Sequence, residues 1–267
     1  MRASRYLCLL PCLAGAPLAA QATSDQARLV FNVNIGYVPG VSGWRVAGQP
    51  LFDDRSDPVL IDSLTLSRRI RSALSFGAQA IYYPGEHFGW LGEAQLIGLG
   101  FEDSCTVTAG SGSTRNTAIC SGIAGSQSSG TAVLIGGGMI YRMLSQKTVS
   151  PYARIGLGAV ISTQSSIRTF GTFPGQTGEA VEVEIYPDES TTRVTLGATL
   201  GAGFTAAIGR GYQLRWEVTD RIVGVRGVTA PTVQDGAAPP TSLRYRHLFG
   251  VQVGFDVLLE RKRGRRY

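Results

Sequence analysis

One stretch of the chain decides the fold: Arg193–Thr205, which reads RVTLGATLGAGFT. From Val194 onward every second residue is apolar, and the residues between are small or polar. Because successive side chains of a β-strand point to opposite faces, this period of two predicts a strand with one apolar and one polar face. The same division recurs at Tyr212–Arg221 and at Arg244–Leu259. The pattern favours an all-β fold.

The composition supports this interpretation. Of the 267 residues 35 are Gly, 43% are hydrophobic and 16% are charged. A disordered chain needs low hydrophobicity and high charge, and a helical fold would lose about 1 kcal/mol for each Gly relative to Ala. These properties exclude a disordered chain and a coiled coil. Beyond residue 22 the longest apolar run, Ala132–Tyr141, contains three consecutive Gly, which excludes a helical membrane protein.

The net charge of +6 belongs to the two ends of the chain. Seven of the 25 Lys and Arg lie at the ends, which leaves 18 basic residues against 19 acidic ones in the body. The seven are Arg2, Arg5, Arg261, Lys262, Arg263, Arg265 and Arg266. A nucleic-acid-binding domain needs a basic face on the folded body. We therefore expect no nucleic-acid partner.

Residues 1–22 have the pattern of a secretory signal peptide, with Arg2 and Arg5, an apolar stretch and Ala20-Gln21-Ala22 as the cleavage site. The mature chain then keeps only Cys105 and Cys120. Two thiols in an oxidising compartment should pair, and the bridge would close a Ser/Thr/Gly-rich surface loop. Such a loop of about 15 residues is worth roughly 3 kcal/mol. The expected organisation is a signal at 1–22, a β-barrel at 23–260 and a basic tail at 261–267.

Eight segments carry the strand pattern. They are Leu29–Val38, Leu64–Tyr83, Phe88–Phe101, Thr131–Met143, Pro151–Ile161, Arg193–Thr205, Tyr212–Arg221 and Tyr245–Leu259. Short connections (84–87, 144–150 and 209–211) alternate with long ones (39–63, 102–130, 162–191 and 224–242). This alternation places all the long loops at one end of an up-and-down meander. The predicted fold is an eight-stranded antiparallel up-and-down transmembrane β-barrel.

Aromatic residues gather at the strand ends beside the short turns. They are Tyr82, Tyr83, Phe88, Trp90, Tyr141, Tyr152, Tyr212 and Phe255. In a membrane barrel they would form an interfacial girdle, and in a soluble barrel they would cap the core. The polar face is crowded with Gly and Thr, as a narrow interior requires, whereas the larger apolar residues lie on the other face.

The last strand carries a motif, QVGFDVLL at residues 252–259. It resembles the C-terminal assembly signature of Gram-negative outer-membrane proteins, with Gln252, Gly254, Val257 and Leu259 at the signature positions. The segment PYARIGLG at 151–158 resembles a middle strand of small OmpA-like and OmpW-like barrels. The resemblance implies residence in the outer membrane, contact with membrane lipid and lipopolysaccharide, and recognition by the outer-membrane assembly machinery. Those proteins usually end on the last strand, whereas this chain continues through a basic tail.

The inward register of the predicted strands is rich in charge. It holds Glu93, Arg142, Arg154, Arg193, Arg215, Glu217, Arg221, Arg244, Arg246 and Asp256. Eight strands enclose an interior only wide enough for side chains, so opposite charges there should pair and plug the lumen. A basic conduit for anions is the alternative. Because basic groups outnumber acidic ones, some Arg should lie near the mouths.

The sequence offers little catalytic chemistry. Its two histidines are His87, in a predicted turn, and His247, on the lipid-facing register, and neither has a Ser or carboxylate at an arguable position beside it. We therefore expect no enzymatic activity, and no cofactor or metal site. The third long connection carries Glu179, Glu182, Glu184, Asp188 and Glu189, alternating with apolar residues, which indicates a hairpin arm with a solvated acidic face or a divalent-cation site.

Three functional hypotheses remain. The leading one is an outer-membrane barrel with a structural or surface-interaction role, whose long loops meet an unidentified partner. The second is a small OmpW-like conduit for apolar or anionic solutes. The third is a soluble periplasmic ligand-binding barrel, which would have to bury the apolar face.

Overall fold

The computed structural model describes residues 28–54, 57–109, 112–124, 126–144, 148–175, 177–188, 193–209 and 211–260. The expected signal peptide and basic tail lie outside these residues. The elements are β1 (Arg28–Val38), β2 (Val41–Asp54), β3 (Asp57–Ile70), β4 (Ala73–Tyr83), β5 (Phe88–Gly98), β6 (Phe101–Ala109), α1 (Thr114–Ala124), β7 (Gln127–Ser128), β8 (Thr131–Arg142), β9 (Val149–Ser162), β10 (Thr169–Pro174), β11 (Ala180–Tyr186), β12 (Arg193–Gly209), β13 (Tyr212–Val228) and β14 (Thr241–Glu260). In this part of the chain no helix is long and apolar enough to cross a membrane.

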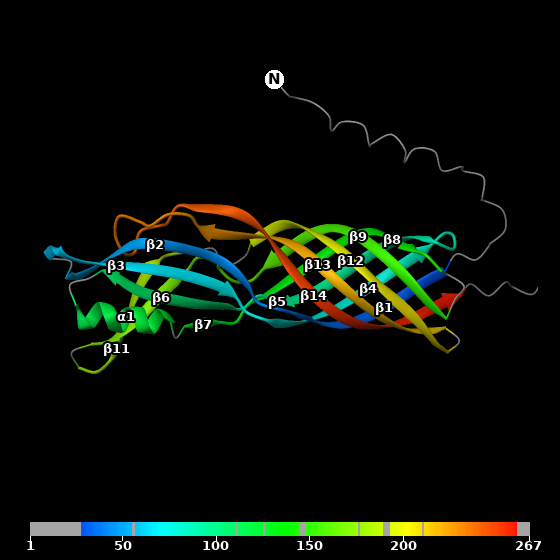
Figure 1. The fold of residues 1–267 in the computed structure, drawn as a ribbon, viewed down its shortest axis with the longest axis horizontal. Coiled ribbons are helices and arrows are strands. Elements are labelled where there is room, and N and C mark those ends of the chain that lie inside the picture. Colours follow the sequence, from blue (N-terminus) through cyan, green and yellow to red (C-terminus); the bar gives the residue numbers. More distant parts are fainter. Residues whose placement is uncertain are drawn as a thin grey trace, which may run out of the picture.

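Eight of the strands close into a barrel in the order β1-β14-β13-β12-β9-β8-β5-β4 (Figure 1). Closure is visible at β1, where Asn32 is opposite Asp256 of β14 on one side and Gln79 of β4 on the other. Every pairing in the barrel is antiparallel. The predicted eight-stranded antiparallel barrel is confirmed.

The two faces of the barrel wall differ as the period of two predicts. On β1 the outward side chains of Phe31, Val33 and Ile35 are 45%, 61% and 47% exposed, whereas the inward Asn32 and Asn34 are buried. The outer surface is therefore apolar and the interior polar. A soluble barrel needs the reverse arrangement, because exposed apolar surface in water is costly.

Apart from the hairpin expected in the third one, the long connections contain more secondary structure than the sequence predicted. They contain a four-stranded sheet (β2-β3-β6-β7), a hairpin (β10-β11) and α1, which continue beyond one end of the barrel (Figure 1). We call these elements, with the distal end of β13, the outer domain. Its buried core comprises Trp44, Val46, Leu51, Leu64, Leu66, Ile119, Cys120, Ile123, Ile167, Val183, Ile185, Tyr186 and Val228. The four connections fold together because each supplies apolar side chains that only the others can cover.

The hairpin expected in the acidic third connection is confirmed, since β10 pairs with β11. The single strand predicted at residues 64–83 is instead two elements, β3 and β4. Buried positions are even-numbered in β3, at Leu64 and Leu66, and odd-numbered in β4, at Gln79 and Ile81. This change of parity marks the place where the chain leaves the outer sheet and enters the barrel. The predicted strand at 88–101 likewise divides into β5 and the start of β6.

The aromatic girdle is smaller than the sequence indicated. Trp90, Tyr141 and Tyr212 are exposed on the outer surface, but Tyr83 and Tyr152 are each 2% exposed and lie inside the barrel. Both occupy inward positions of their strands, and both belong to a buried apolar cluster with Ile81 and Leu91.

The predicted disulfide between Cys105 and Cys120 is present, and it joins β6 to α1. The segment it closes is half helical rather than a loop. Ser113 begins α1 as a cap, since its hydroxyl accepts a hydrogen bond from the Asn116 N–H at 3.2 Å. Gly122 permits close packing of the helix, because a Cβ there would lie 2.7 Å from the backbone of Thr172 in β10.

We expect that replacing Cys105 and Cys120 together by Ser will loosen the outer domain and leave the barrel folded. The bridge restrains α1 against β6, and a 15-residue closure is worth about 3 kcal/mol in the chain-entropy model. Hydrogen exchange should accelerate in residues 101–124, while strands β12–β14 keep their protection. Equal acceleration in the barrel strands would show that the two parts unfold as one unit.

Candidate functional site

The middle of the barrel is filled by a buried ionic network. Arg215 of β13 is fully buried, and its Nη2 lies 2.8 Å from Oδ2 of Asp256 on β14. Arg154 of β9 bridges two acids, with Nη1 2.7 Å from Oε2 of Glu93 and Nε 2.7 Å from Oε1 of Glu217. All of these charges come from inward positions, on four strands: β5, β9, β13 and β14. Each is compensated, as a buried charge requires.

Neutral polar groups complete the network. The Tyr152 hydroxyl donates to Glu217 Oε2 at 2.6 Å, and Asn32 Nδ2 donates to Asp256 Oδ1 at 2.5 Å. Arg221, which is 1% exposed, donates to the amide oxygen of Gln252 at 2.8 Å. Arg221 makes no ion pair among the described residues. Together with Arg154 and Arg215 it gives the polar layer three Arg, which balance the three acids of the two ion-pair groups.

Inward glycines provide the space for these side chains. At Gly201 an added Cβ would lie 2.4 Å from Glu217 Oε1 and 2.9 Å from Arg154 Nε. At Gly77 it would lie 2.6 Å from Gln95 Nε2. The Gly-rich polar face of the sequence is therefore the complement of the network. Sequence reasoning identified a narrow interior, but not which glycine faces which charge.

Apolar layers close the lumen above and below the network. The layer at the short-turn end consists of Val30, Ile81, Tyr83, Leu91, Ile140 and Tyr152. The layer at the outer-domain end consists of Val38, Ile70, Ile97, Leu99, Phe101, Ala132, Leu134, Val160, Val223 and Leu248. An apolar layer on each side separates the buried ion pairs from bulk water.

The remaining inward charges lie at the two mouths. Arg142 is 3% exposed, and its guanidinium carbon is 4.1 Å from the ring centroid of Tyr83 at the short-turn end. At the other end Arg193 pairs with Asp188, with 2.5 Å between Nη2 and Oδ2.

The sequence predicted that Arg244 and Arg246 are lumen charges, but neither lies in the lumen. Arg244 is exposed, and Arg246 is half-buried and donates to the carbonyl of Gly43 in β2. The physical reason is the length of β14. It continues past the end of β1, with which its pairing stops at Val251 opposite Tyr37, so these two arginines stand above the lumen beside the outer domain.

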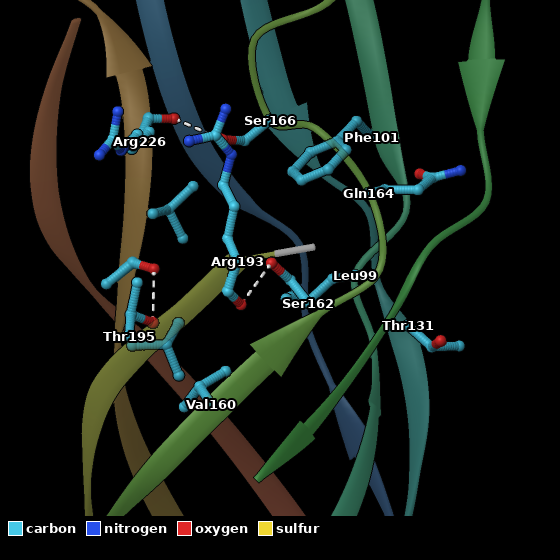
Figure 2. Close-up of a pocket in the computed structure, with 13 residues that line it drawn as sticks. Leu99, Phe101, Thr131, Val160, Ser162, Gln164, Ser166, Arg193, Thr195 and Arg226 are labelled. Atoms are coloured by element: carbon cyan, nitrogen blue, oxygen red, sulfur yellow. Dashed lines mark hydrogen bonds between the residues drawn. The ribbon is translucent and has the colours of Figure 1, made fainter. Parts of the chain in front are cut away.

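A small cavity of about 30 Å³ lies between the outer domain and the apolar layer at the outer-domain end of the barrel. Figure 2 shows Leu99, Phe101 and Val160 on its wall, with the side chain of Arg193 crossing it toward Ser166 and Arg226. The Ser166 hydroxyl donates to the Arg226 carbonyl at 2.7 Å and holds this segment in place. The cavity has room for one or two water molecules, not for a larger solute.

A closed antiparallel barrel of even strand number, apolar outside and polar inside, with tight turns at one end and long connections at the other, has the features of bacterial outer-membrane barrels. The chain is a small outer-membrane β-barrel. In barrels of this type the long connections are extracellular, and this is the orientation that we expect for the outer domain. The four residues that resemble the assembly signature lie in β14, with Gln252 and Gly254 buried, Val257 half-buried and Leu259 exposed.

Comparison with known proteins agrees at the level of the fold. No family model matches the sequence, and no curated protein matches it. Among solved structures, the outer membrane protein OprG from Pseudomonas aeruginosa is similar, at 10% identity and a TM-score of 0.49, over 87% of this chain and 96% of that one. AlkL is similar at 14% identity and a TM-score of 0.42, over 94% and 98%. Neisserial surface protein A is similar at 10% and 0.43, over 86% and 96%.

The outer domain has a polar anchor in its core. The Tyr186 hydroxyl donates to Oε1 of Gln49 at 2.8 Å, and Gln49 Nε2 donates to the Thr232 hydroxyl at 2.8 Å. Burial raises the pKa of the Tyr186 hydroxyl above its ordinary value. The bonds tie β2, β11 and the connection after β13 into one body.

One pairing was missed by sequence reasoning. Nδ1 of His247 lies 2.7 Å from Oδ2 of Asp220, so a carboxylate does stand beside this histidine on the outer surface. The two residues are 27 positions apart and become neighbours only through the β13–β14 register, in which Asp220 is opposite Phe249. Within the described residues no group of three or more metal-ligating side chains is found.

Proposed function

We propose that this protein is a closed outer-membrane anchor that carries a folded extracellular domain with a surface-interaction role. The observation that carries the proposal is the outer domain itself, which has its own buried core, a disulfide and a polar anchor above a filled lumen. Connections that only joined neighbouring strands would not form a buried core, whereas here Trp44, Tyr186 and Ile119 are each 4% exposed or less.

The filled lumen favours the interpretation of the barrel as an anchor rather than as a pore. Three Arg (Arg154, Arg215 and Arg221) lie among three acids (Glu93, Glu217 and Asp256), so the polar layer has no net charge to attract ions. Eight strands leave no space beyond that occupied by their inward side chains.

The proposal includes the organisation of the whole chain. A signal at 1–22 directs export, the barrel spans 23–260 and a basic tail occupies 261–267. The assembly machinery reads Gln252, Gly254, Val257 and Leu259 on β14. Membrane lipid and lipopolysaccharide surround the apolar wall, on which Phe31 and Val33 are exposed. The protein acts without a cofactor and is not an enzyme.

We expect that the purified protein shows no stable open channel in a planar bilayer at pH 7. The ion-pair network and the two apolar layers leave no hydrated path, so conductance should stay at the level of the protein-free bilayer. A steady anion-selective current that falls in Arg154→Ala or Arg215→Ala would contradict this expectation and favour the conduit.

The surface role is tested on cells. Cells that produce the intact protein should adhere to one another or to a solid surface more than cells that produce an equal surface amount of a variant whose outer domain is unfolded. Equal adhesion of the two strains would overturn the surface-interaction role while leaving the closed barrel in place.

The second candidate is a conduit for small apolar solutes. The apolar part of the wall of the cavity in Figure 2 favours it, and the cavity, which has room for one or two water molecules, would have to widen for such a solute to pass. Leu99, Phe101, Val160 and Val223 give the cavity an apolar wall at the junction of barrel and outer domain. Faster uptake of an apolar solute by producing cells, abolished when Val160→Trp fills the cavity, would support this function over the anchor.

A further inference from the structure

The outer wall of the barrel has a groove of about 570 Å³ that crosses four neighbouring strands, β12, β13, β14 and β1. Its floor is a row of short side chains, Ala202, Val218 and Val251, which are opposite one another in the strand registers. Tyr37 of β1 ends this row, because it pairs with Val251. All four side chains are exposed. The groove therefore belongs to the outer surface of the barrel and not to the lumen.

Larger side chains stand on both sides of this row. Toward the short-turn end, the rings of Phe204 and Trp216 are stacked with their centroids 5.1 Å apart. Toward the outer domain, the next outward residue of β14 is Phe249, which is 57% exposed. The groove exists because the row between these rings carries only small or short side chains, with an alanine at position 202.

The height of the groove places it in the leaflet on the side of the outer domain. Tyr212 is exposed at the short-turn end of β13, and Val218 is six residues farther along the same strand. Six residues of a strand tilted by about 40° rise about 15 Å. The apolar band of an outer-membrane barrel is about 25 Å tall, so Val218 lies in the half nearer the outer domain. In the expected orientation this half is the outer leaflet.

Basic side chains lie beyond the groove, where β1 leads into β2. Arg69 of β3 is exposed, and its Nε would be 3.3 Å from a Cβ at Gly40. Arg246 of β14 donates a hydrogen bond to the carbonyl of Gly43. Among the described residues neither guanidinium forms an ion pair. Both cations are therefore left to meet an anion from outside the chain.

The acids of this region do not cancel the two arginines. Glu102 is opposite Arg69 in the β3–β6 register, and Oδ2 of Asp220 lies 2.7 Å from Nδ1 of His247. Together with Arg246, basic groups outnumber acidic ones. Anionic lipid headgroups are attracted to clustered basic residues at a membrane surface. The groove and the basic cluster are therefore complementary to a lipid with a hydrocarbon chain and a phosphorylated headgroup.

We propose that the groove holds an acyl chain of lipid A, the phosphorylated lipid of lipopolysaccharide, and that a phosphate of the same molecule binds Arg69 and Arg246. Within the apolar band only a lipid chain or another membrane protein can reach the groove. A second copy of this chain, related by a two-fold axis along the membrane normal, would bring the two basic clusters together, and like charges repel. This inference rests on the membrane anchor of the proposed function and names the lipid that one part of its wall selects.

The test uses the fluorescence of Trp216, which lines the groove, in the full chain refolded into bilayers of brominated phosphatidylcholine. Brominated acyl chains quench a Trp that they contact. Trp90→Phe leaves Trp216 as the reporter, since the third Trp of the chain, Trp44, is buried in the outer domain. Trp216→Phe leaves Trp90, on the wall at β5, as the matched reporter. Lipid A or unbrominated phosphatidylcholine is then added, and the recovery of fluorescence is measured.

At Trp216 we expect lipid A to restore the fluorescence at about a tenfold lower mole fraction than unbrominated phosphatidylcholine. At Trp90 the two lipids should act alike. Ala202→Phe, which fills the groove, should remove most of the preference at Trp216. Arg69→Gln combined with Arg246→Gln should do the same, because it removes the cations that bind the phosphate.

Ala94→Phe is the matched control, because Ala94 is exposed on β5, outside the groove. It should leave the preference at Trp216 unchanged. Heat-modifiable electrophoretic mobility shows that each variant has a folded barrel. Equal recovery by the two lipids at Trp216, or a preference that Ala202→Phe or the double arginine variant leaves unchanged, would overturn the proposal and leave the membrane anchor in place.

Two further outcomes are informative. Quenching of Trp90 without quenching of Trp216, before any lipid A is added, would show that a second copy covers the groove, and it would overturn the proposal. If neither Trp were quenched, the wall would not face lipid, and the membrane anchor itself would fail.

Discussion

Replacing Asp256 by Ala should lower the free energy of unfolding by about 3–5 kcal/mol, because it leaves a buried cation without its partner. Asp256 is 1% exposed and accepts hydrogen bonds from Nε and Nη2 of Arg215 and from Nδ2 of Asn32. No other acid pairs with Arg215 among the described residues. Urea unfolding of the refolded protein in lipid bilayers measures the loss, and the compact unboiled band should disappear at a lower temperature.

A double variant separates the charge from the packing. Replacing Arg215 by Met together with Asp256 by Leu removes both charges, and it should recover most of the stability, since apolar groups of similar volume often replace a buried pair at little cost. Asp220→Ala is the control for loss of an acid on the outer wall, and it should change stability by less than about 1 kcal/mol. If the double variant were as unstable as Asp256→Ala, the ion pair would not be the cause.

Replacing Trp44 by Ala should unfold the outer domain and spare the barrel. Trp44 is 4% exposed, its ring is 5.9 Å from that of Tyr186 edge-on, and its Nε1 donates to the Ser166 carbonyl at 2.9 Å. Loss of a buried Trp costs about 3–5 kcal/mol. Limited proteolysis should cleave within residues 41–70 and 163–188, while the far-UV signal and the heat-modifiable mobility of the barrel remain.

Trp90→Ala is the matched control. Trp90 is 53% exposed on the lipid-facing wall, so its removal deletes the same side chain without opening the core of the outer domain. The control should resist the protease as the unaltered protein does. If Trp44→Ala abolished barrel folding as well, the outer domain would be part of one cooperative unit with the barrel, and the description of an anchor with a separate domain would be wrong.

The filled interior of the barrel and the outer domain share a boundary. Phe101 belongs to the upper apolar layer of the barrel, and Arg68 on the neighbouring strand β3 lies over its ring, 5.4 Å from the centroid, and over that of Trp44 at 5.5 Å. The guanidinium thereby contacts both the apolar layer of the barrel and the core of the outer domain. The position of the outer domain over the barrel is therefore fixed by packing as well as by the chain connections.

The sequence by itself determined the faces of the strands, and therefore the barrel. A period of two decides which side chains point inward whatever their neighbours are, and alternating connection lengths decide which end is extended. The same local rule placed Arg154, Arg215, Glu217 and Asp256 on the inner face. The presence of two cysteines, Cys105 and Cys120, after the expected signal peptide sufficed to predict the disulfide.

Only the tertiary structure decided which inward groups meet. Arg215 and Asp256 are opposite neighbours because of the β13–β14 register, and Arg154 reaches Glu93 across 61 residues of sequence. Nothing local fixes such a register, because a shift by two residues along the strand keeps the same side chains on the inner face and changes only their partners. The outer domain is the extreme case: Trp44 bonds to Ser166, 122 residues away. Its core exists only because four connections, each too short to bury its own apolar residues, converge at one end of a closed barrel.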